Sequence, residues 1–148
     1  DEMWRMLPEA ARKEAANVHL ASFPEANPKW ADEKLAQRWE QLLEIRVAVQ
    51  ASLEAQRRDK VIGSALEAKV VLTADDATLA FLKPYESELP ALFIVSQVAL
   101  ERGAQKGCSA EIRRAEGGKC ERCWNYRPAV GTFKDHPTLC DRCVEAIR

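Results

Sequence analysis

Two short stretches near the end of the sequence, "KCERCW" at residues 119–124 and "LCDRCV" at residues 139–144, each hold two cysteines separated by two residues. The four thiols belong to Cys120, Cys123, Cys140 and Cys143. A two-residue spacer lets both sulfurs of a tight knuckle reach one ion, and Zn²⁺ takes four such ligands in a tetrahedron at about 2.3 Å. The sixteen residues between the pairs are enough for a hairpin that returns the second pair to the first. This spacing predicts one zinc site, and it fits a redox dithiol or an iron–sulfur site less well.

The predicted zinc is structural rather than catalytic. All four positions are filled by thiolates, so no position is left for a water nucleophile. A segment this short with few apolar side chains needs the metal to supply its folding free energy. The fifth cysteine, Cys108, lies outside the pattern and is expected to be a partly buried, small apolar residue. His136 is expected to be a loop residue rather than a ligand.

Aromatic and basic residues are interleaved around the second thiol. The segment "WNYRPAVGTFK" at residues 124–134 follows Cys123 directly. Aromatic rings can stack on unpaired bases, while Arg and Asn can bind phosphates or base edges. The candidate RNA contacts are Arg122, Trp124, Asn125, Tyr126 and Arg127. The alternative is that Trp124 and Phe133 form a small core over the zinc; we expect this for Phe133 and base contact for Trp124.

Composition limits the classes of function. The net charge is −1, which argues against a strongly basic nucleic-acid binder, although residues 117–148 alone carry six basic and four acidic side chains. The start of the sequence does not resemble a signal peptide. The longest apolar run, at residues 91–100, is too short to span a bilayer. We therefore expect a cytoplasmic location, where a reducing environment favours metal ligation over disulfides.

The first long pattern upstream of the cysteines is helical. Asn27 can cap a helix and Pro28 is favoured at its first position, so a helix is predicted over residues 28–57. Its apolar face consists of Leu35, Trp39, Leu42, Val49 and Leu53. We expect the opposite, charged face to be solvated. A coiled coil is a weaker alternative because Ile45 and Val47 lie off the apolar face.

The pattern changes after Gly63. The expected elements are a strand over 68–73, a helix over 75–89 capped by Asp75, a buried strand over 91–100 and an edge strand over 109–115. These elements predict an α+β fold, in which a helical segment with a long amphipathic helix precedes a small mixed α/β layer and a C-terminal four-cysteine zinc ribbon. The expected parts are residues 1–62, 63–116 and 117–148, with a hinge at Gly117 and Gly118.

The cysteine segment also resembles a known family. "GGKCERCWNYRPAVGTFKDHPTLCDRCVEAI" at residues 117–147 is similar to the C-terminal zinc module of bacterial-type isoleucyl-tRNA synthetases. "DEMWRMLP" at residues 1–8 resembles the end of the anticodon-binding helical bundle of that family, and "NVHLASFPE" at residues 17–25 resembles the connector that follows. "DKVIGSALEAKVVL" at residues 59–72 resembles a long-helix exit shared by related synthetases. The resemblance covers nearly the whole chain and is most specific in the zinc segment.

The resemblance implies a longer enzyme that activates isoleucine with ATP and attaches it to its tRNA. The His-Ile-Gly-His and Lys-Met-Ser-Lys-Ser types of ATP-binding signature do not occur in this sequence, so we expect no catalytic residue here and ATP binding only in the parent enzyme. The expected role is recognition of the anticodon stem-loop of isoleucine tRNA, by Arg122 and Trp124 first and by Asn125, Tyr126 and Arg127 second. The other expected partners are the N-terminal domains of the same chain. We expect the protein to be a monomer and not to bind a membrane.

Two alternatives stay open. The zinc module is also similar to the end of DNA glycosylases of the formamidopyrimidine type. Those enzymes use an N-terminal proline and place a β-sandwich before the finger, whereas residue 1 here is Asp and a long helix is predicted. Alternatively, the zinc ribbon could be a protein-interaction module. In that case Trp124 would pack against a partner chain and tRNA would have no effect.

Overall fold

The computed structural model describes residues 2–12 and 15–147, which divide into two compact units with the boundary between Ala36 and Gln37. The first unit contains two short α-helices and two 3-10 helices: α1 (Glu2–Met6), α2 (Glu9–Arg12), η1 (Val18–Leu20) and η2 (Pro28–Trp30). None of these four elements buries a residue. Met6, which lies in the segment that resembles the end of a helical bundle, is 80% exposed. The longest helix, α3 (Glu33–Arg58), continues into the second unit.

The second unit is built on a three-stranded sheet with the order β2-β1-β3. Its strands are β1 (Ala68–Ala74), β2 (Gln97–Arg102) and β3 (Cys108–Arg114). The helical elements around them are η3 (Ala65–Glu67), α4 (Asp76–Leu82), η4 (Lys83–Tyr85) and α5 (Leu89–Phe93). β1 pairs parallel with β2 and antiparallel with β3, with Val70 opposite both Val98 and Ile112. The predicted α+β class, with a long helix and a small mixed sheet, is confirmed.

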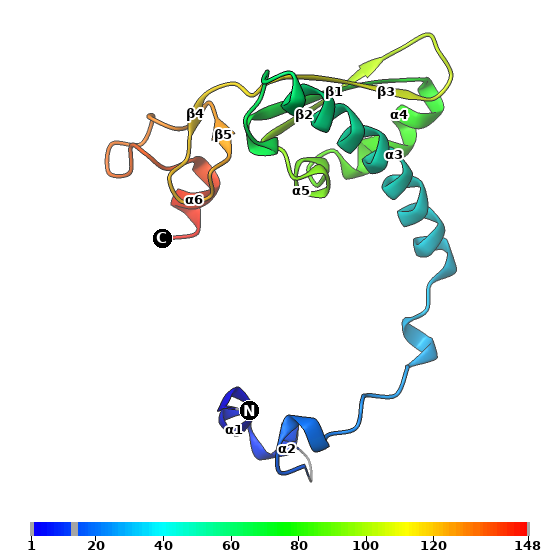
Figure 1. Cartoon of the computed structure of the whole chain (residues 1–148), viewed down its shortest axis with the longest axis vertical. Coiled ribbons are helices and arrows are strands. Elements are labelled where there is room, and N and C mark those ends of the chain that lie inside the picture. Colours follow the sequence, from blue (N-terminus) through cyan, green and yellow to red (C-terminus); the bar gives the residue numbers. More distant parts are fainter. Residues whose placement is uncertain (1, 13–14, 148) are drawn as a thin grey trace. The chain divides into compact units, whose positions relative to one another are not determined.

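The core lies on one face of this sheet, and Figure 1 shows α3, α4 and α5 on the same side of the strands. Side chains alternate between the two faces along a strand. The buried cluster accordingly includes alternate residues of β1, among them Val70 and Leu72. Its helical residues are Leu42, Val49, Leu53, Leu82, Leu89 and Phe93. The opposite face carries the exposed, ion-paired Glu111 and Arg113, with Arg113 Nε 2.7 Å from Glu111 Oε1.

Several predicted boundaries are wrong for local reasons. Asn27 and Pro28 begin the 3-10 turn η2, and α3 begins only at Glu33 after Asp32, whose Oδ1 accepts from the Leu35 N–H at 2.9 Å. On the predicted apolar face, Trp39 remains 46% exposed. Ile45, which was predicted to lie off that face, packs against the core.

The predicted single helix over residues 75–89 is interrupted. Asp75 caps α4 as expected, with its Oδ1 accepting from the Thr78 N–H at 2.8 Å. α4 ends at Leu82, and a separate helix, α5, includes the first residues of the predicted strand 91–100. The left-handed residue Ile94 (φ 59°) ends α5, so strand β2 begins only at Gln97.

The cysteine segment forms a small module at the end of the second unit. It contains a two-stranded hairpin, β4 (Gly118–Lys119) with β5 (Tyr126–Arg127), and a short helix, α6 (Asp141–Glu145). The division into parts over residues 1–62, 63–116 and 117–148 stays a prediction. Within the described residues, no helix is both long and apolar enough to cross a membrane.

Candidate metal centre and nucleic-acid interface

Two local structures bring the four thiols together. The β4–β5 hairpin encloses the first pair, because the Cys120 N–H donates to the Asn125 carbonyl at 2.9 Å and the Trp124 N–H donates to the Cys120 carbonyl at 2.8 Å. The second pair lies at the start of α6, with Cys140 as the N-cap and Cys143 within the helix. A knuckle and a helix start therefore present two sulfurs each.

The sulfur geometry fits a tetrahedral metal site. The ligand atoms of Cys120, Cys123, Cys140 and Cys143 all lie within 4.8 Å of one another. The Sγ atoms of Cys123 and Cys140 are 3.7 Å apart. A tetrahedron with metal–sulfur bonds of about 2.3 Å has sulfur–sulfur edges of about 3.8 Å. Three of the thiols are buried and Cys123 is half-buried, so the site suits one structural Zn²⁺.

Hydrogen-bond donors surround the sulfurs. The Cys140 N–H donates to Cys120 Sγ at 3.4 Å, Asn125 Nδ2 lies 3.6 Å from Cys123 Sγ, and Arg122 Nη1 lies 3.6 Å from Cys143 Sγ. Such donors outside the ligand shell orient metal ligands and stabilise their negative charge.

The thiol pKa values reflect the same crowding. Burial alone would raise the pKa of Cys120, but backbone N–H groups, including that of Cys140, lower it to about 6. Burial together with the neighbouring thiols raises the pKa of Cys140 to about 12. The pKa values of these two thiols therefore shift in opposite directions, although both belong to one cluster. A bound divalent ion would override these shifts, since a thiol that coordinates a metal is deprotonated outright.

Trp124 has an unusual backbone conformation for a large residue. Its φ of 65° is in the left-handed region, and its side chain is 60% exposed. A bulky side chain rarely adopts this region, where glycine is the residue without a steric penalty. The exposure places the indole outside the small core that was the alternative prediction. Val130 and Leu139 pack against the thiol cluster instead, and neither was identified from the sequence.

The other candidate RNA contacts divide into exposed and half-buried residues. Arg122 is exposed. Asn125, Tyr126 and Arg127 are half-buried, and each has an internal bond: the Asn125 amide with Cys123, the Tyr126 N–H with Ser96 Oγ at 2.7 Å, and Arg127 Nη1 with Asp141 Oδ2 at 3.4 Å. The structure thus leaves Arg122 and Trp124 as the most accessible pair.

The remaining sequence predictions concern Cys108, His136 and Phe133. Cys108, the first residue of edge strand β3, is exposed on one side, while its other side lines an apolar hollow and burial there raises the pKa of its thiol. His136 is an exposed loop residue, and among the described residues it is not part of the metal-ligating cluster. Phe133 is half-buried, but the apolar residues that pack against the thiols are Val130 and Leu139.

Two polar side chains at the start of β2 attach the module to the sheet. Ser96 Oγ donates to the Leu66 carbonyl at 2.5 Å and accepts from the Tyr126 N–H at 2.7 Å. Gln97 binds both backbone groups of Glu116, donating to its carbonyl at 2.8 Å and accepting from its N–H at 3.1 Å. The segment leading into the predicted hinge is therefore held at Glu116. Sequence patterns did not identify either residue, because "SQ" at residues 96–97 looks like an interruption of an apolar run.

Replacing Ser96 tests this attachment. Ser96 is 5% exposed, and Ser96→Ala leaves the Leu66 carbonyl and the Tyr126 N–H without their partner. An unsatisfied buried polar group costs about 1–3 kcal/mol, so we expect a loss of about 2 kcal/mol in the free energy of unfolding. Urea denaturation measures it, and faster hydrogen exchange at the Tyr126 amide locates it. The exposed Ser109→Ala is the control, and an equal loss in both variants would contradict the role of Ser96.

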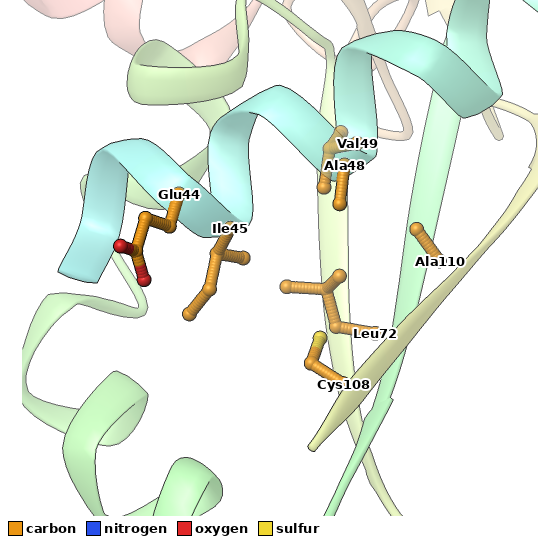
Figure 2. Close-up of a pocket in the computed structure, with 7 residues that line it drawn as sticks. All are labelled: Glu44, Ile45, Ala48, Val49, Leu72, Cys108 and Ala110. Carbon is orange, nitrogen blue, oxygen red and sulfur yellow. The ribbon is translucent and has the colours of Figure 1, made fainter.

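Two apolar hollows border α3 in the second unit. One, of about 230 Å³, is lined by Glu44, Ile45, Ala48, Val49, Leu72, Cys108 and Ala110, and Figure 2 shows these side chains between the helix and the strands. The other, of about 350 Å³, is lined mainly by aromatic and aliphatic residues including Trp39 and Tyr85. Each hollow is lined mainly by apolar side chains, with one carboxylate in each, Glu44 in the first and Glu88 in the second.

Comparison with known proteins adds to this geometry. Residues 117–146 match the family described as "Zinc finger found in FPG and IleRS". The chain is 41% identical over 157 residues to the isoleucine–tRNA ligase of Geobacter sulfurreducens, covering 100% of this chain and 17% of that protein. It is 40% identical to the ligases of Syntrophotalea carbinolica and Gloeobacter violaceus, covering 99% of this chain and 16% of each of those proteins. The chain thus spans less than a fifth of the length of these relatives.

Proposed function

We propose that this chain, which is about 40% identical over its whole length to isoleucine–tRNA ligases, is the C-terminal region of such a ligase and recognises tRNA for that enzyme. Those matches confirm the resemblance to isoleucyl-tRNA synthetases. The finger family includes both FPG and IleRS proteins, but the three relatives reported above match 99–100% of the chain and are ligases, which disfavours the glycosylase alternative. In the proposed parent enzyme, ATP-dependent attachment of isoleucine takes place outside these residues, and this chain binds the anticodon region.

The observation that carries the proposal is the strained, exposed Trp124. A non-glycine residue in a sparsely populated region of backbone conformation costs about 1–3 kcal/mol. Glycine would avoid that cost at φ 65°, and the 60% exposed indole recovers little by burial. Strain of this kind is characteristic of functional sites. A fixed, solvent-facing aromatic ring suits stacking on an unpaired base, which is how single-stranded RNA loops are commonly bound.

Arg122 supplies the second part of the proposed contact. It lies between the first two thiols and bonds Cys143 Sγ through a single nitrogen, Nη1, at 3.6 Å. A guanidinium has five N–H donors, so the others remain for a phosphate or a base edge. Asn125, Tyr126 and Arg127 stay predicted contacts of second rank, because each is half-buried whereas Arg122 is exposed.

The four cysteines are the proposed zinc ligands, and the metal would act by holding this knuckle in shape. With four thiolates it offers no open coordination position and no nucleophile. The residues that would meet RNA are next to the ligands in sequence: Arg122 lies inside the first pair and Trp124 follows it. Recognition therefore depends on a folded metal site without any chemistry at the metal.

Replacing Trp124 by glycine separates recognition from folding. Trp124→Gly removes the indole and relieves the left-handed strain, so we expect unchanged zinc content and unfolding free energy within about 1 kcal/mol of wild type. Loss of base stacking is worth about 1–3 kcal/mol, and we expect the affinity for an isoleucine-tRNA anticodon stem-loop to fall roughly tenfold. Fluorescence anisotropy of labelled RNA with the zinc-loaded chain, at one fixed low salt concentration, measures it.

Ile94→Gly is the matched control. Ile94 is also left-handed (φ 59°) and 55% exposed, but it lies at the end of α5, so its replacement should relieve strain without changing RNA affinity. Arg122→Ala should weaken binding as well, and a stem-loop with a scrambled loop should bind less tightly than the cognate one. Equal binding of both loops, or no binding by the wild-type chain, would refute the proposal and favour a protein-interaction module.

A further inference from the structure

A lysine that neither the sequence patterns nor the family resemblance identified lies against Trp124. The Nζ atom of Lys119 sits over the indole, 5.9 Å from the ring centroid. Lys119 is the last residue of β4 and is exposed, as is Trp124. An ammonium group above an aromatic face is attracted by the electron density of the ring. The two side chains therefore form one exposed surface that combines a flat apolar ring with a positive charge.

The ammonium of Lys119 is more available than the neighbouring cations. Arg127 is paired with Asp141 at 3.4 Å, and Arg122 bonds the Cys143 thiol. Among the described residues, no ion pair joins Lys119 to a carboxylate. A cation–π contact at an exposed site is weak, so the ammonium can exchange the ring for a stronger anionic partner at little cost.

The backbone keeps the two residues together. Lys119 is paired with Tyr126 across the β4–β5 hairpin, and the Trp124 N–H donates to the carbonyl of Cys120, the residue after Lys119. Both side chains therefore project from one hydrogen-bonded knuckle. A ligand that stacks on the face of Trp124 opposite the ammonium would leave the ammonium group of Lys119 over the other face, beside the bound ligand.

We propose that Lys119 is a further RNA-binding residue, whose ammonium contacts the phosphate of a nucleotide that stacks its base on Trp124. The inference rests on the proposed function and adds one residue and one ligand group to it. The lysine stem has four carbons and carries a mobile point charge, which suits a phosphate near the ring edge better than a base edge. Stacking and backbone charge are the two components by which proteins bind unpaired nucleotides. The ligand class is thus an unpaired nucleotide bound through both its base and its phosphate.

The test is the salt dependence of RNA binding. Lys119→Met keeps the length and apolar character of the stem and removes the charge. In the zinc-loaded chain we expect a threefold to fivefold loss of anticodon stem-loop affinity at low salt, about the size of one exposed ion pair. We also expect the slope of log K against log salt concentration to become shallower by about 0.7, as for one phosphate contact on a single strand. Lys119→Arg should restore both quantities.

Lys106→Met is the matched control, since Lys106 is exposed in the loop between β2 and β3 at the opposite end of the sheet from the zinc module. Lys106→Met also removes one positive charge, and it should change neither the affinity for the anticodon stem-loop nor the slope of log K against log salt concentration. Zinc content and unfolding are measured for every variant, and Lys119→Gln repeats the comparison if Lys119→Met loses metal. Unchanged affinity and slope in Lys119→Met, with weakened binding in Trp124→Gly, would overturn the role of Lys119 alone. No RNA binding by the wild-type chain would overturn the proposed function, and the role of Lys119 with it.

Discussion

Removing zinc with a chelator is expected to unfold residues 117–147 and to leave α3 and the three-stranded sheet folded. The buried residues of this module are Cys120, Cys140, Cys143 and Val144, three of which are proposed ligands. Without the metal, almost nothing apolar remains to offset the loss of chain entropy. Zinc binding contributes about 10–16 kcal/mol in small fingers at neutral pH, far more than any single side chain here. Circular dichroism should retain most of its helical signal, while amide exchange in the module becomes fast.

The second half of this expectation follows from the separation of the two buried clusters. The core cluster that contains Leu42, Val70 and Phe93 includes no residue of the zinc module. Unfolding the module would break the hydrogen bonds of Ser96 to Tyr126 and of Gln97 to Glu116. Strand β2 would then be held less firmly at its start, but the hydrophobic core would remain. Loss of all helical signal on chelation would contradict this independence.

Cysteine variants provide the matched comparison. Cys143→Ser removes one proposed ligand and should reproduce the effect of the chelator at limiting zinc. Cys108→Ser changes the one cysteine outside the cluster, and zinc content should remain at one ion per chain. Re-addition of zinc should restore slow amide exchange in the wild-type chain and in Cys108→Ser. Equal zinc loss in the two variants would show that the four-thiol assignment is wrong.

The fold class and the cysteine cluster were predictable from the sequence because their signals are periodic or fixed in spacing. Two cysteine pairs are informative whatever their surroundings, and the alternation in residues 68–74 indicated β1 nearly to the residue. The strand predicted over residues 91–100 was wrong in its first half, because an apolar run does not distinguish a buried helix turn from a strand. Ile94 ends α5 in a left-handed conformation that its β-branched side chain gives no reason to expect.

The parts of the site that were missed depend on contacts between segments distant in sequence. Ser96 and Tyr126 are thirty residues apart, and only the folded chain shows that one hydroxyl joins Leu66 to β5. Lys119 could be recognised as basic, but its place over the Trp124 ring depends on the hairpin. The left-handed backbone of Trp124 is likewise a property of the knuckle, since the residue itself favours other conformations.

Gly117→Ala is expected to disrupt the zinc module almost as severely as loss of a ligand. Gly117 has a φ of 89°, and a Cβ atom there would lie 2.3 Å from the carbonyl carbon of Arg127 and 2.4 Å from the nitrogen of Pro128. Both are backbone atoms that cannot rotate away. Left-handed strain and overpacking each cost about 1–3 kcal/mol, so the module should lose about 3 kcal/mol or more. Since folding and metal binding are coupled, zinc affinity should fall by roughly a hundredfold.

Gly131→Ala separates the two causes within the same module. Gly131 has nearly the same φ, 93°, but nothing lies within 4 Å of the added Cβ. It should show the conformational penalty alone, and zinc affinity measured by competition with a chromogenic chelator should fall much less than in Gly117→Ala. The difference in zinc affinity between the two variants reports the close approach of Gly117 to the backbone of Arg127 and Pro128. A methyl group at position 117 fits only if this backbone moves away, and that movement would disturb the adjacent pairing of Gly118 with Arg127. Equal losses of zinc affinity in the two variants would mean that the close backbone contact is not the reason for glycine at position 117. The flexible hinge predicted at Gly117 and Gly118 would then be the better explanation.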